Sequence, residues 1–145
     1  MISEFANIFN QFAGVWSLER KISSGENLNG KAVFERVSHT VFLLREEGEL
    51  TLQNGTSINA ARDWYWHLLS SQELEITYDE TGQEKYHLLD LSLKNDNWLG
   101  SSDHLCGDDH YFGSYKFDIN SFQIKQTIKG PNKNYSVESN YFKTS

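Results

Sequence analysis

From Gly14 onward, apolar and polar residues alternate with a period of two, in short segments separated by turn-forming residues. The segment 122–129 is the clearest case, because Phe122, Ile124 and Ile128 alternate with polar side chains. This pattern is typical of a β-strand with one buried face, since successive side chains point to opposite faces of a strand. The intervening Asn-Gly and Gly-Pro-Asn-Lys sequences favour short turns.

The alternation predicts nine or ten strands joined by short connections. The expected strands are 14–22, 30–37, 40–52, 58–69, 73–78, 84–93, 98–106, 109–118, 122–129 and 135–142. An antiparallel meander of this kind leaves exposed edges unless it closes on itself. We therefore expect an all-β fold, a closed antiparallel up-and-down barrel of 8–10 strands. A β-sandwich is the alternative, although its crossovers usually need longer connections.

The segment 1–13 differs from the rest because its apolar residues recur at helical spacing. These residues are Ile2, Phe5, Ile8, Phe9 and Phe12. The pattern predicts a short helix that packs on the barrel formed by residues 14–145. With a single hydrophobic pattern, the whole chain 1–145 is expected to be one domain.

The composition narrows the class of protein. A formal net charge of −7 argues against nucleic-acid binding, which needs a basic stripe. The single cysteine, Cys106, excludes an intrachain disulfide and fits a reducing compartment. The chain shows no signal peptide and no apolar run of the roughly twenty residues that span a bilayer. A soluble, cytoplasmic protein is the simplest expectation.

Several motifs resemble those of known barrel families. Gly14-Val-Trp16 follows an amphipathic helix and opens the first strand, which is similar to the calycin superfamily of lipocalins, fatty-acid-binding proteins and relatives. A larger set resembles an uncharacterised lipocalin-like family, a domain of unknown function. This set is Gly-x-Trp-x-Leu-x-Arg20, Arg45-Glu-Glu-Gly48, His104-Leu-Cys-Gly-x-Asp-x-Tyr111 and Gly130-Pro-x-Lys133. The resemblance implies the barrel and brings no established activity or catalytic residue.

The chain also departs from these families. It has neither the signal peptide nor the disulfide pair of true lipocalins. It lacks the Gly-x-Trp-x-Gly-x-Gly opening of the nitrobindin-like haem barrels, so haem is only a runner-up as a ligand.

Titratable side chains are concentrated in the segment 104–117. If the strand 109–118 turns the apolar Phe117 inward, every second residue before it also faces the interior. Polar groups inside a sheet are informative because their burial is costly unless they are paired. The inward set expected from this segment is His104, Cys106, Asp109, Tyr111 and Tyr115.

Other strands place further polar residues on the inward face by the same alternation. Starting from an inward Trp16, Arg20 also faces inward, and the alternation of 122–129 places Gln126 inside. In the strand 58–69 two phases are open, one with Arg62 inside and a less apolar one with His67 inside. A buried arginine needs a counter-ion. We expect Asp109 to supply one, which leaves a second arginine for a ligand carboxylate or phosphate.

This set of inward polar side chains predicts a ligand-binding site in the barrel and no metal site. Its expected residues are Arg20, Arg62, His87, His104, Cys106, Asp109, Tyr111, Tyr115, Gln126 and Lys133. The favoured function is binding of a small amphipathic or anionic molecule. One alternative is an enzyme with His104 as acid or base, oriented by Asp109, and with Arg and Tyr side chains stabilising an oxyanion. Another is haem or metal binding through His104 and Cys106. Whether the chain is an enzyme, its cofactor and its oligomeric state stay open.

Overall fold

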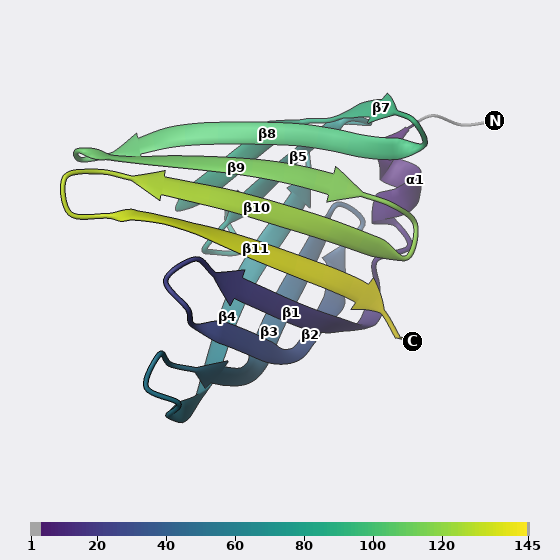
Figure 1. The fold of residues 1–145 in the computed structure, drawn as a ribbon. Coiled ribbons are helices and arrows are strands. Elements are labelled where there is room, and N and C mark those ends of the chain that lie inside the picture. Colours follow the sequence, from purple (N-terminus) through teal and green to yellow (C-terminus); the bar gives the residue numbers. More distant parts are fainter. Residues whose placement is uncertain (1–3, 145) are drawn as a thin grey trace.

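Eleven antiparallel strands form one continuous sheet that rolls into a barrel (Figure 1). The computed structural model describes residues 4–144. The strands are β1 (Gly14–Ile22), β2 (Asn27–Ser38), β3 (Val41–Thr51), β4 (Ser57–Leu68), β5 (Glu73–Thr77), β6 (Lys85–Asp90), β7 (Ser92–Lys94), β8 (Asn97–Cys106), β9 (Asp109–Phe117), β10 (Ser121–Lys129) and β11 (Asn134–Lys143). The all-β barrel is confirmed. Its strands number eleven because the segment expected as one strand over 84–93 is divided into β6 and β7.

The barrel closes at a seam where two strands pack without pairing. The sheet order is β6-β5-β4-β3-β2-β1-β11-β10-β9-β8-β7, so β6 and β7 are its two edges. Side chains of β6, and that of Leu91 directly after it, lie against the inner face of β8 and β9. A Cβ atom at Gly113 would lie 2.6 Å from Cε1 of His87, and one at Gly100 would lie 2.6 Å from Cδ2 of Leu91. Glycines on these two strands therefore make room for the seam.

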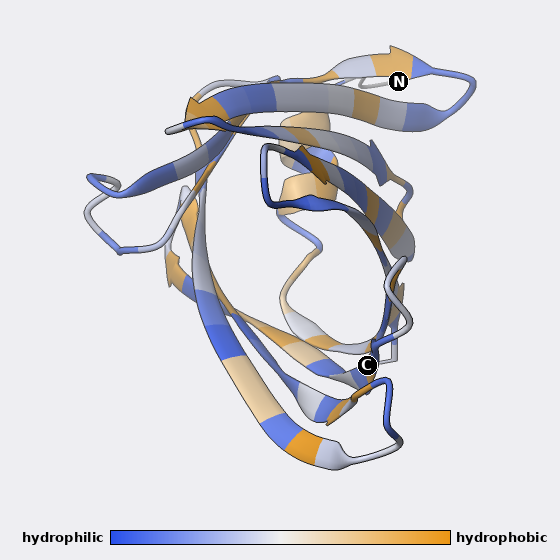
Figure 2. Cartoon of the chain, turned by 60° about the vertical axis from the view of Figure 1, so that its left-hand side comes forward, coloured by the Kyte–Doolittle hydropathy of each residue, from blue (hydrophilic) through white to orange (hydrophobic). Residues whose placement is uncertain are grey.

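The N-terminal helix α1 (Phe5–Phe9) fills one end of the barrel, as Figure 2 shows by its apolar colour at the far end. Phe5, Phe9 and Phe12 are fully buried. The indole nitrogen of Trp16 in β1 donates a hydrogen bond of 2.9 Å to the carbonyl oxygen of Phe12, in the segment that follows the helix. The helix is shorter than the expected 1–13, and residues 1–3 of that range lie outside the described residues.

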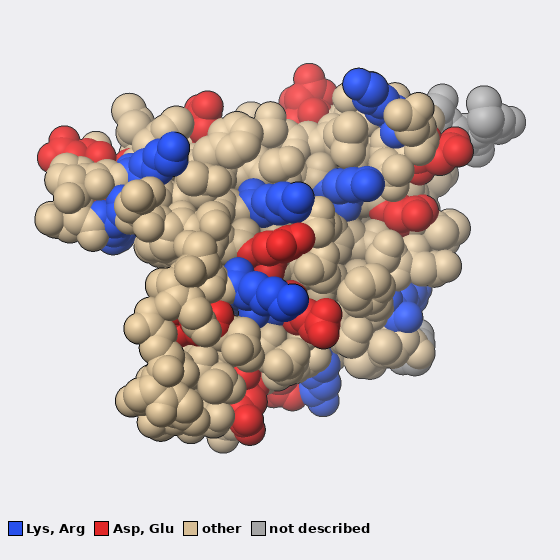
Figure 3. Space-filling model, viewed as in Figure 1, with Lys and Arg blue, Asp and Glu red and all other residues tan. Residues whose placement is uncertain are grey.

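The inner face of the sheet follows the expected alternation. Ile124 and Ile128 of β10 and Tyr115 and Phe117 of β9 are buried. In β4 the buried residues belong to the more apolar phase, the one that contains Arg62, so the structure decides between the two open phases. The outer side of β8–β11 and β1 carries basic and acidic side chains side by side (Figure 3).

Candidate functional site

Two adjacent cavities lie inside the barrel, and Arg20, Glu46 and Arg62 line both. The inner cavity has a volume of about 30 Å³ and the outer one about 160 Å³. The other residues around the outer cavity are apolar: Ile22, Leu28, Leu50, Ala60 and Ala61. The inner one is also lined by aromatic and polar side chains, including Trp64, Tyr86, Tyr115, Gln126, Ser139 and Tyr141. Cavities for drug-sized ligands measure about 300–1,000 Å³, so this lumen suits a compact molecule.

A closed polar cluster borders the two cavities. The Arg20 Nη2 atom lies 3.1 Å from both carboxylate oxygens of Glu46, and Arg20 Nε donates to Ser139 Oγ at 2.7 Å. Tyr141 accepts from Arg20 at 2.9 Å and donates to Glu46. Burial lowers the pKa of Arg20, but Tyr141 and Glu46 raise that pKa more, so it lies above its ordinary value. Arg20 is therefore a charged group that is already paired within the protein.

The counter-ion expected for an inward arginine is a different residue. Glu46 rather than Asp109 pairs with Arg20, and that expectation is wrong. Asp109 instead lies 3.4 Å from Nζ of Lys133, across the tips of the β8–β9 and β10–β11 hairpins. A Cβ atom at Gly130 would lie 1.9 Å from Oδ1 of Asp109, which explains the glycine in this turn. This contact between Asp109 and Lys133 lies at the rim of the barrel. Among residues 4–144, no hydrogen bond joins Asp109 to His104.

Arg62 is the cation of the lumen that has no carboxylate partner. Its guanidinium carbon lies 4.9 Å above the ring of Trp64, in a cation–π contact. No Asp or Glu oxygen lies within 4 Å of its nitrogens among residues 4–144. Arg62 is exposed at the mouth and borders both cavities. Its donors are free to bind a group from outside the chain.

Tyr86 adds a second free donor. The pairing of β5 with β6 shifts between Ile76 and Thr77, so Tyr86 has no partner across the ladder. This bulge turns both Tyr86 and the buried His87 toward the interior, whereas strict alternation would separate them. Gln126 donates its amide hydrogen to the Tyr86 hydroxyl, whose own hydrogen is left for an acceptor. Burial raises the pKa of Tyr86, so the phenol stays protonated at neutral pH.

His87 and Tyr115 form a buried pair beside the inner cavity. Nδ1 of His87 lies 2.5 Å from the hydroxyl of Tyr115. Burial, and to a lesser extent His104, lowers the pKa of His87 to about 4, so the imidazole is neutral at pH 7. Burial also holds the pKa of Tyr115 well above its ordinary value. Both groups are therefore uncharged hydrogen-bonding groups.

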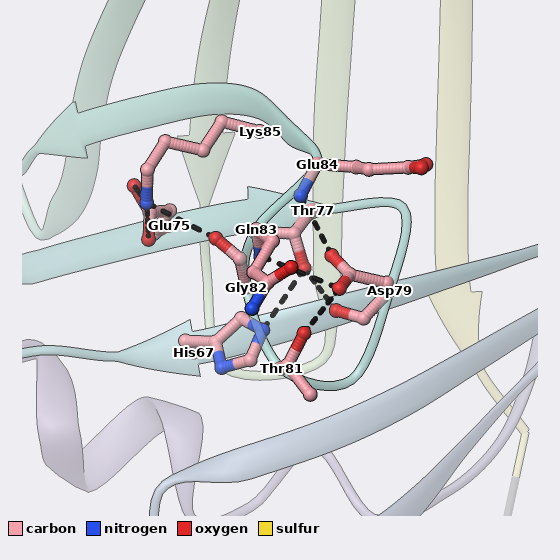
Figure 4. Close-up of polar contacts among 9 residues, drawn as sticks. All are labelled: His67, Glu75, Thr77, Asp79, Thr81, Gly82, Gln83, Glu84 and Lys85. Carbon is pink, nitrogen blue, oxygen red and sulfur yellow. Dashed lines mark hydrogen bonds and ion pairs between the residues drawn. The ribbon is translucent and has the colours of Figure 1, made fainter.

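The β5–β6 hairpin that carries this bulge is fixed by its own polar contacts (Figure 4). The Asp79 carboxylate accepts from Thr81 Oγ1 and from the backbone amides of Gln83 and Glu84. The Thr77 hydroxyl donates to the Asp79 carbonyl at 2.6 Å, so it accepts from Nε2 of His67 at 2.9 Å. The Thr81 hydrogen bond, followed by the backbone amides, lowers the pKa of Asp79. This cluster serves the hairpin, because every contact stays within β4, β5 and the turn.

Most of the expected site residues lie together in the interior of the barrel. Arg20, Arg62, Tyr115 and Gln126 line the inner cavity, and His87 and His104 lie behind Tyr115 and Tyr86. Asp109, Tyr111 and Lys133 form the rim contact, in which Lys133 donates to the Tyr111 hydroxyl at 3.1 Å. Cys106 is exposed at the end of β8. Their roles in binding stay predictions.

Sequence reasoning missed Glu46, Tyr86 and Tyr141. Glu46 lies in a run of charged residues, which is typical of a solvent-exposed segment. However, Phe42 and Leu44 face inward, and the same alternation places Glu46 on the inner face two residues after Leu44. That alternation is the signal that could have found it. Tyr86 depends on the bulge, for which the sequence carries no comparable signal.

The structure also bears on metal binding and on membrane-spanning helices. Within residues 4–144, no three His, Cys, Asp or Glu side chains come together as metal ligands. No helix in the same range is long and apolar enough to cross a membrane.

The comparisons with known proteins identify the family. The sequence matches the family of unknown function DUF6314 over residues 12–143. The chain belongs to that family. No curated protein matches it. The further calycin resemblance stays a prediction.

Three solved structures share the fold of this DUF6314 protein. Rv2717c from M. tuberculosis has a TM-score of 0.69 at 10% identity, and the match covers 96% of both chains. The S-type phycobiliprotein lyase CPES from Guillardia theta has a TM-score of 0.57 at 9% identity, over 98% of this chain and 93% of that one. EF1p2_mFAP2b bound to DFHBI has a TM-score of 0.54 at 11% identity, over 96% and 98%. At identities this low, the structural matches show a common fold alone.

Proposed function

We propose that the barrel binds a compact amphipathic anion, with its acidic head on Arg62 and its apolar body in the outer cavity. The unpaired guanidinium of Arg62 at the junction of the two cavities carries this proposal. Guanidinium binds carboxylate and phosphate through paired, charge-assisted hydrogen bonds, which are stronger than neutral ones.

The free polar groups around the proposed position of the ligand head are hydrogen-bond donors, so they favour a head that accepts hydrogen bonds. Arg62 and the free hydrogen of Tyr86 are donors, whereas the carboxylate of Glu46 is occupied by Arg20 and Tyr141. A ligand that brought only donors would leave these groups unpaired. The acidic head would therefore meet two donors and no free carboxylate.

The outer cavity sets the size and character of the body. Its walls are the aliphatic side chains of Ile22, Leu28, Leu50 and Ala60, and its volume is about 160 Å³. This volume suits a small ring or a short chain rather than a long fatty acid. The barrel structure bound to DFHBI supports the idea that this architecture can hold a small molecule.

Matched acids and alcohols test this function. Tryptophan fluorescence and thermal shift would be measured with hexanoate, benzoate, hexan-1-ol and benzyl alcohol, because Trp64 lies directly under Arg62. We expect the acids to bind at least tenfold more tightly than the alcohols, a difference of about 1.4 kcal/mol. Arg62→Gln should remove that preference and leave alcohol binding unchanged. Arg45→Gln, on the outer face of β3, is the control and should bind as the wild type does.

Two outcomes would contradict the proposal. Equal binding of acids and alcohols by the wild-type protein would show that no cation selects the head. Binding of acids that survives in Arg62→Gln but is lost in the control would place the anion outside the lumen.

A further inference from the structure

Three hydroxyl groups lie on the wall of the inner cavity, those of Tyr86, Tyr115 and Ser139. Gln126 donates a hydrogen bond to the Tyr86 hydroxyl. Arg20 Nε donates to Ser139 Oγ at 2.7 Å. A hydroxyl that accepts one hydrogen bond can still donate its own hydrogen, and among residues 4–144 no acceptor takes the hydrogen of Tyr86 or Ser139. Both hydrogens are therefore free for a group in the cavity.

The hydrogen of the third hydroxyl depends on the tautomer of His87, whose imidazole is neutral at pH 7. Nδ1 of His87 lies 2.5 Å from the Tyr115 hydroxyl, whereas its buried Nε2 has no partner in the described part of the chain. With the hydrogen on Nε2, a buried donor stays unpaired and Tyr115 donates its own hydrogen to Nδ1. With the hydrogen on Nδ1, His87 donates to Tyr115, whose hydrogen is then free to reach the cavity. An acceptor in the inner cavity favours the second tautomer, because only a lone pair on Nε2 is then unpaired.

The inner cavity has room for one small polar group. Its volume is about 30 Å³, and a cavity needs about 10–15 Å³ to hold a water molecule. Arg62 borders both this cavity and the aliphatic outer one, so a carboxylate on Arg62 lies where the two meet. The carbon atom next to that carboxylate then places one substituent in the inner cavity, while the chain continues into the outer cavity.

We propose that the ligand is a short apolar 2-oxo acid, whose oxo group accepts hydrogen bonds from Tyr115 and Ser139 in the inner cavity. The 2-oxo group adds to the anion site proposed above and depends on it, since Arg62 must hold the carboxylate. An oxo group only accepts hydrogen bonds, which suits a wall of hydroxyl donors. Within residues 4–144, the one carboxylate of that wall, Glu46, is already engaged inside the protein, so the hydrogen of a 2-hydroxy acid would meet no charged acceptor.

Four acids with the same six-carbon chain test this assignment with the full chain at pH 7, by tryptophan fluorescence and thermal shift. They are hexanoate, 2-oxohexanoate, 2-hydroxyhexanoate and 2-methylhexanoate. We expect 2-oxohexanoate to bind at least about tenfold more tightly than hexanoate, since hexanoate leaves the hydroxyl donors unpaired. 2-Methylhexanoate fills the same space without an acceptor and should bind no more tightly than hexanoate. 2-Hydroxyhexanoate should bind more weakly than the oxo acid.

A matched pair of variants assigns the oxo group to the inner cavity. Tyr115→Phe removes one donor and should reduce the preference for 2-oxohexanoate over hexanoate by about fivefold, with hexanoate binding unchanged. Tyr65→Phe loses a hydroxyl from the face of β4 that points away from the lumen, and should keep the whole preference. In ¹⁵N spectra of the wild-type protein with 2-oxohexanoate bound, Nδ1 of His87 should carry the hydrogen and Nε2 should not.

Failure of the anion site and failure of the 2-oxo assignment give different results. If hexanoate binds no better than hexan-1-ol, the anion site fails and the 2-oxo assignment fails with it. If hexanoate binds as an anion but 2-oxohexanoate binds no more tightly, only the 2-oxo assignment is overturned. Equal gains from the oxo and methyl groups, or tighter binding of the hydroxy acid, would also overturn it. So would a full preference in folded Tyr115→Phe, or a His87 that carries its hydrogen on Nε2 in the complex.

Discussion

The two halves of the lumen are filled in opposite ways. At the closed end, Phe12 packs among eight other aromatic side chains. At the open end the interior holds a buried ion pair, an unpaired arginine and two cavities. Close packing of apolar rings stabilises the fold, whereas the looser polar half offers groups that a second molecule can bind. The aromatic end thus stabilises the fold, and the binding proposed above belongs to the other end of the barrel.

Removing the centre of the aromatic end should have the largest effect on this division. Phe12→Ala leaves a large void at a fully buried position, so we expect the free energy of unfolding to fall by about 5 kcal/mol, measured by urea denaturation. Phe142→Ala on the outer face, where the ring is half exposed, is the control and should cost less than about 1 kcal/mol. Similar losses in the two variants would show that Phe12 does not anchor the closed end.

Breaking the buried ion pair should have the next largest effect. Glu46→Leu leaves the charge of Arg20 without its partner, and we expect a loss of about 3 kcal/mol in urea denaturation. The double variant Arg20→Met/Glu46→Leu should recover most of that loss, since apolar residues of similar size often replace a buried pair at little cost. A double variant as unstable as the single one would mean that Ser139 and Tyr141 need the charges as well.

The pH dependence of stability should report the smallest of the three effects. His87 has a pKa of about 4 in the folded protein against an ordinary value of 6.5. As the pH falls, its imidazole is therefore protonated in the unfolded chain before it is protonated in the folded protein. The contribution of neutral His87 to the free energy of unfolding is complete above pH 6.5 and is lost as the pH falls toward 4. Between pH 7 and pH 5 we expect a loss of about 2 kcal/mol, measured by urea denaturation at each pH. His87→Gln should remove this part of the slope, and a variant with the wild-type slope would assign it to other groups.

The sequence predicts the barrel and the inward phase of several strands because alternation is a local property. It places Tyr115 and Gln126 inside for that reason. Partners across the barrel depend on how eleven strands roll up, and no local pattern specifies that Glu46 meets Arg20 or that Asp109 meets Lys133. The bulge at Tyr86 is likewise a property of the pairing of β5 with β6.

The seam between β6 and β8 closes the barrel by side-chain packing alone. In a fully paired barrel the ladder of backbone hydrogen bonds fixes the circumference. Here the last contact of the ring is made by Leu91 and His87 against two glycine-bearing strands, without a ladder. At this seam the circumference is therefore fixed by side-chain packing, whereas every other strand contact around the barrel is a backbone ladder.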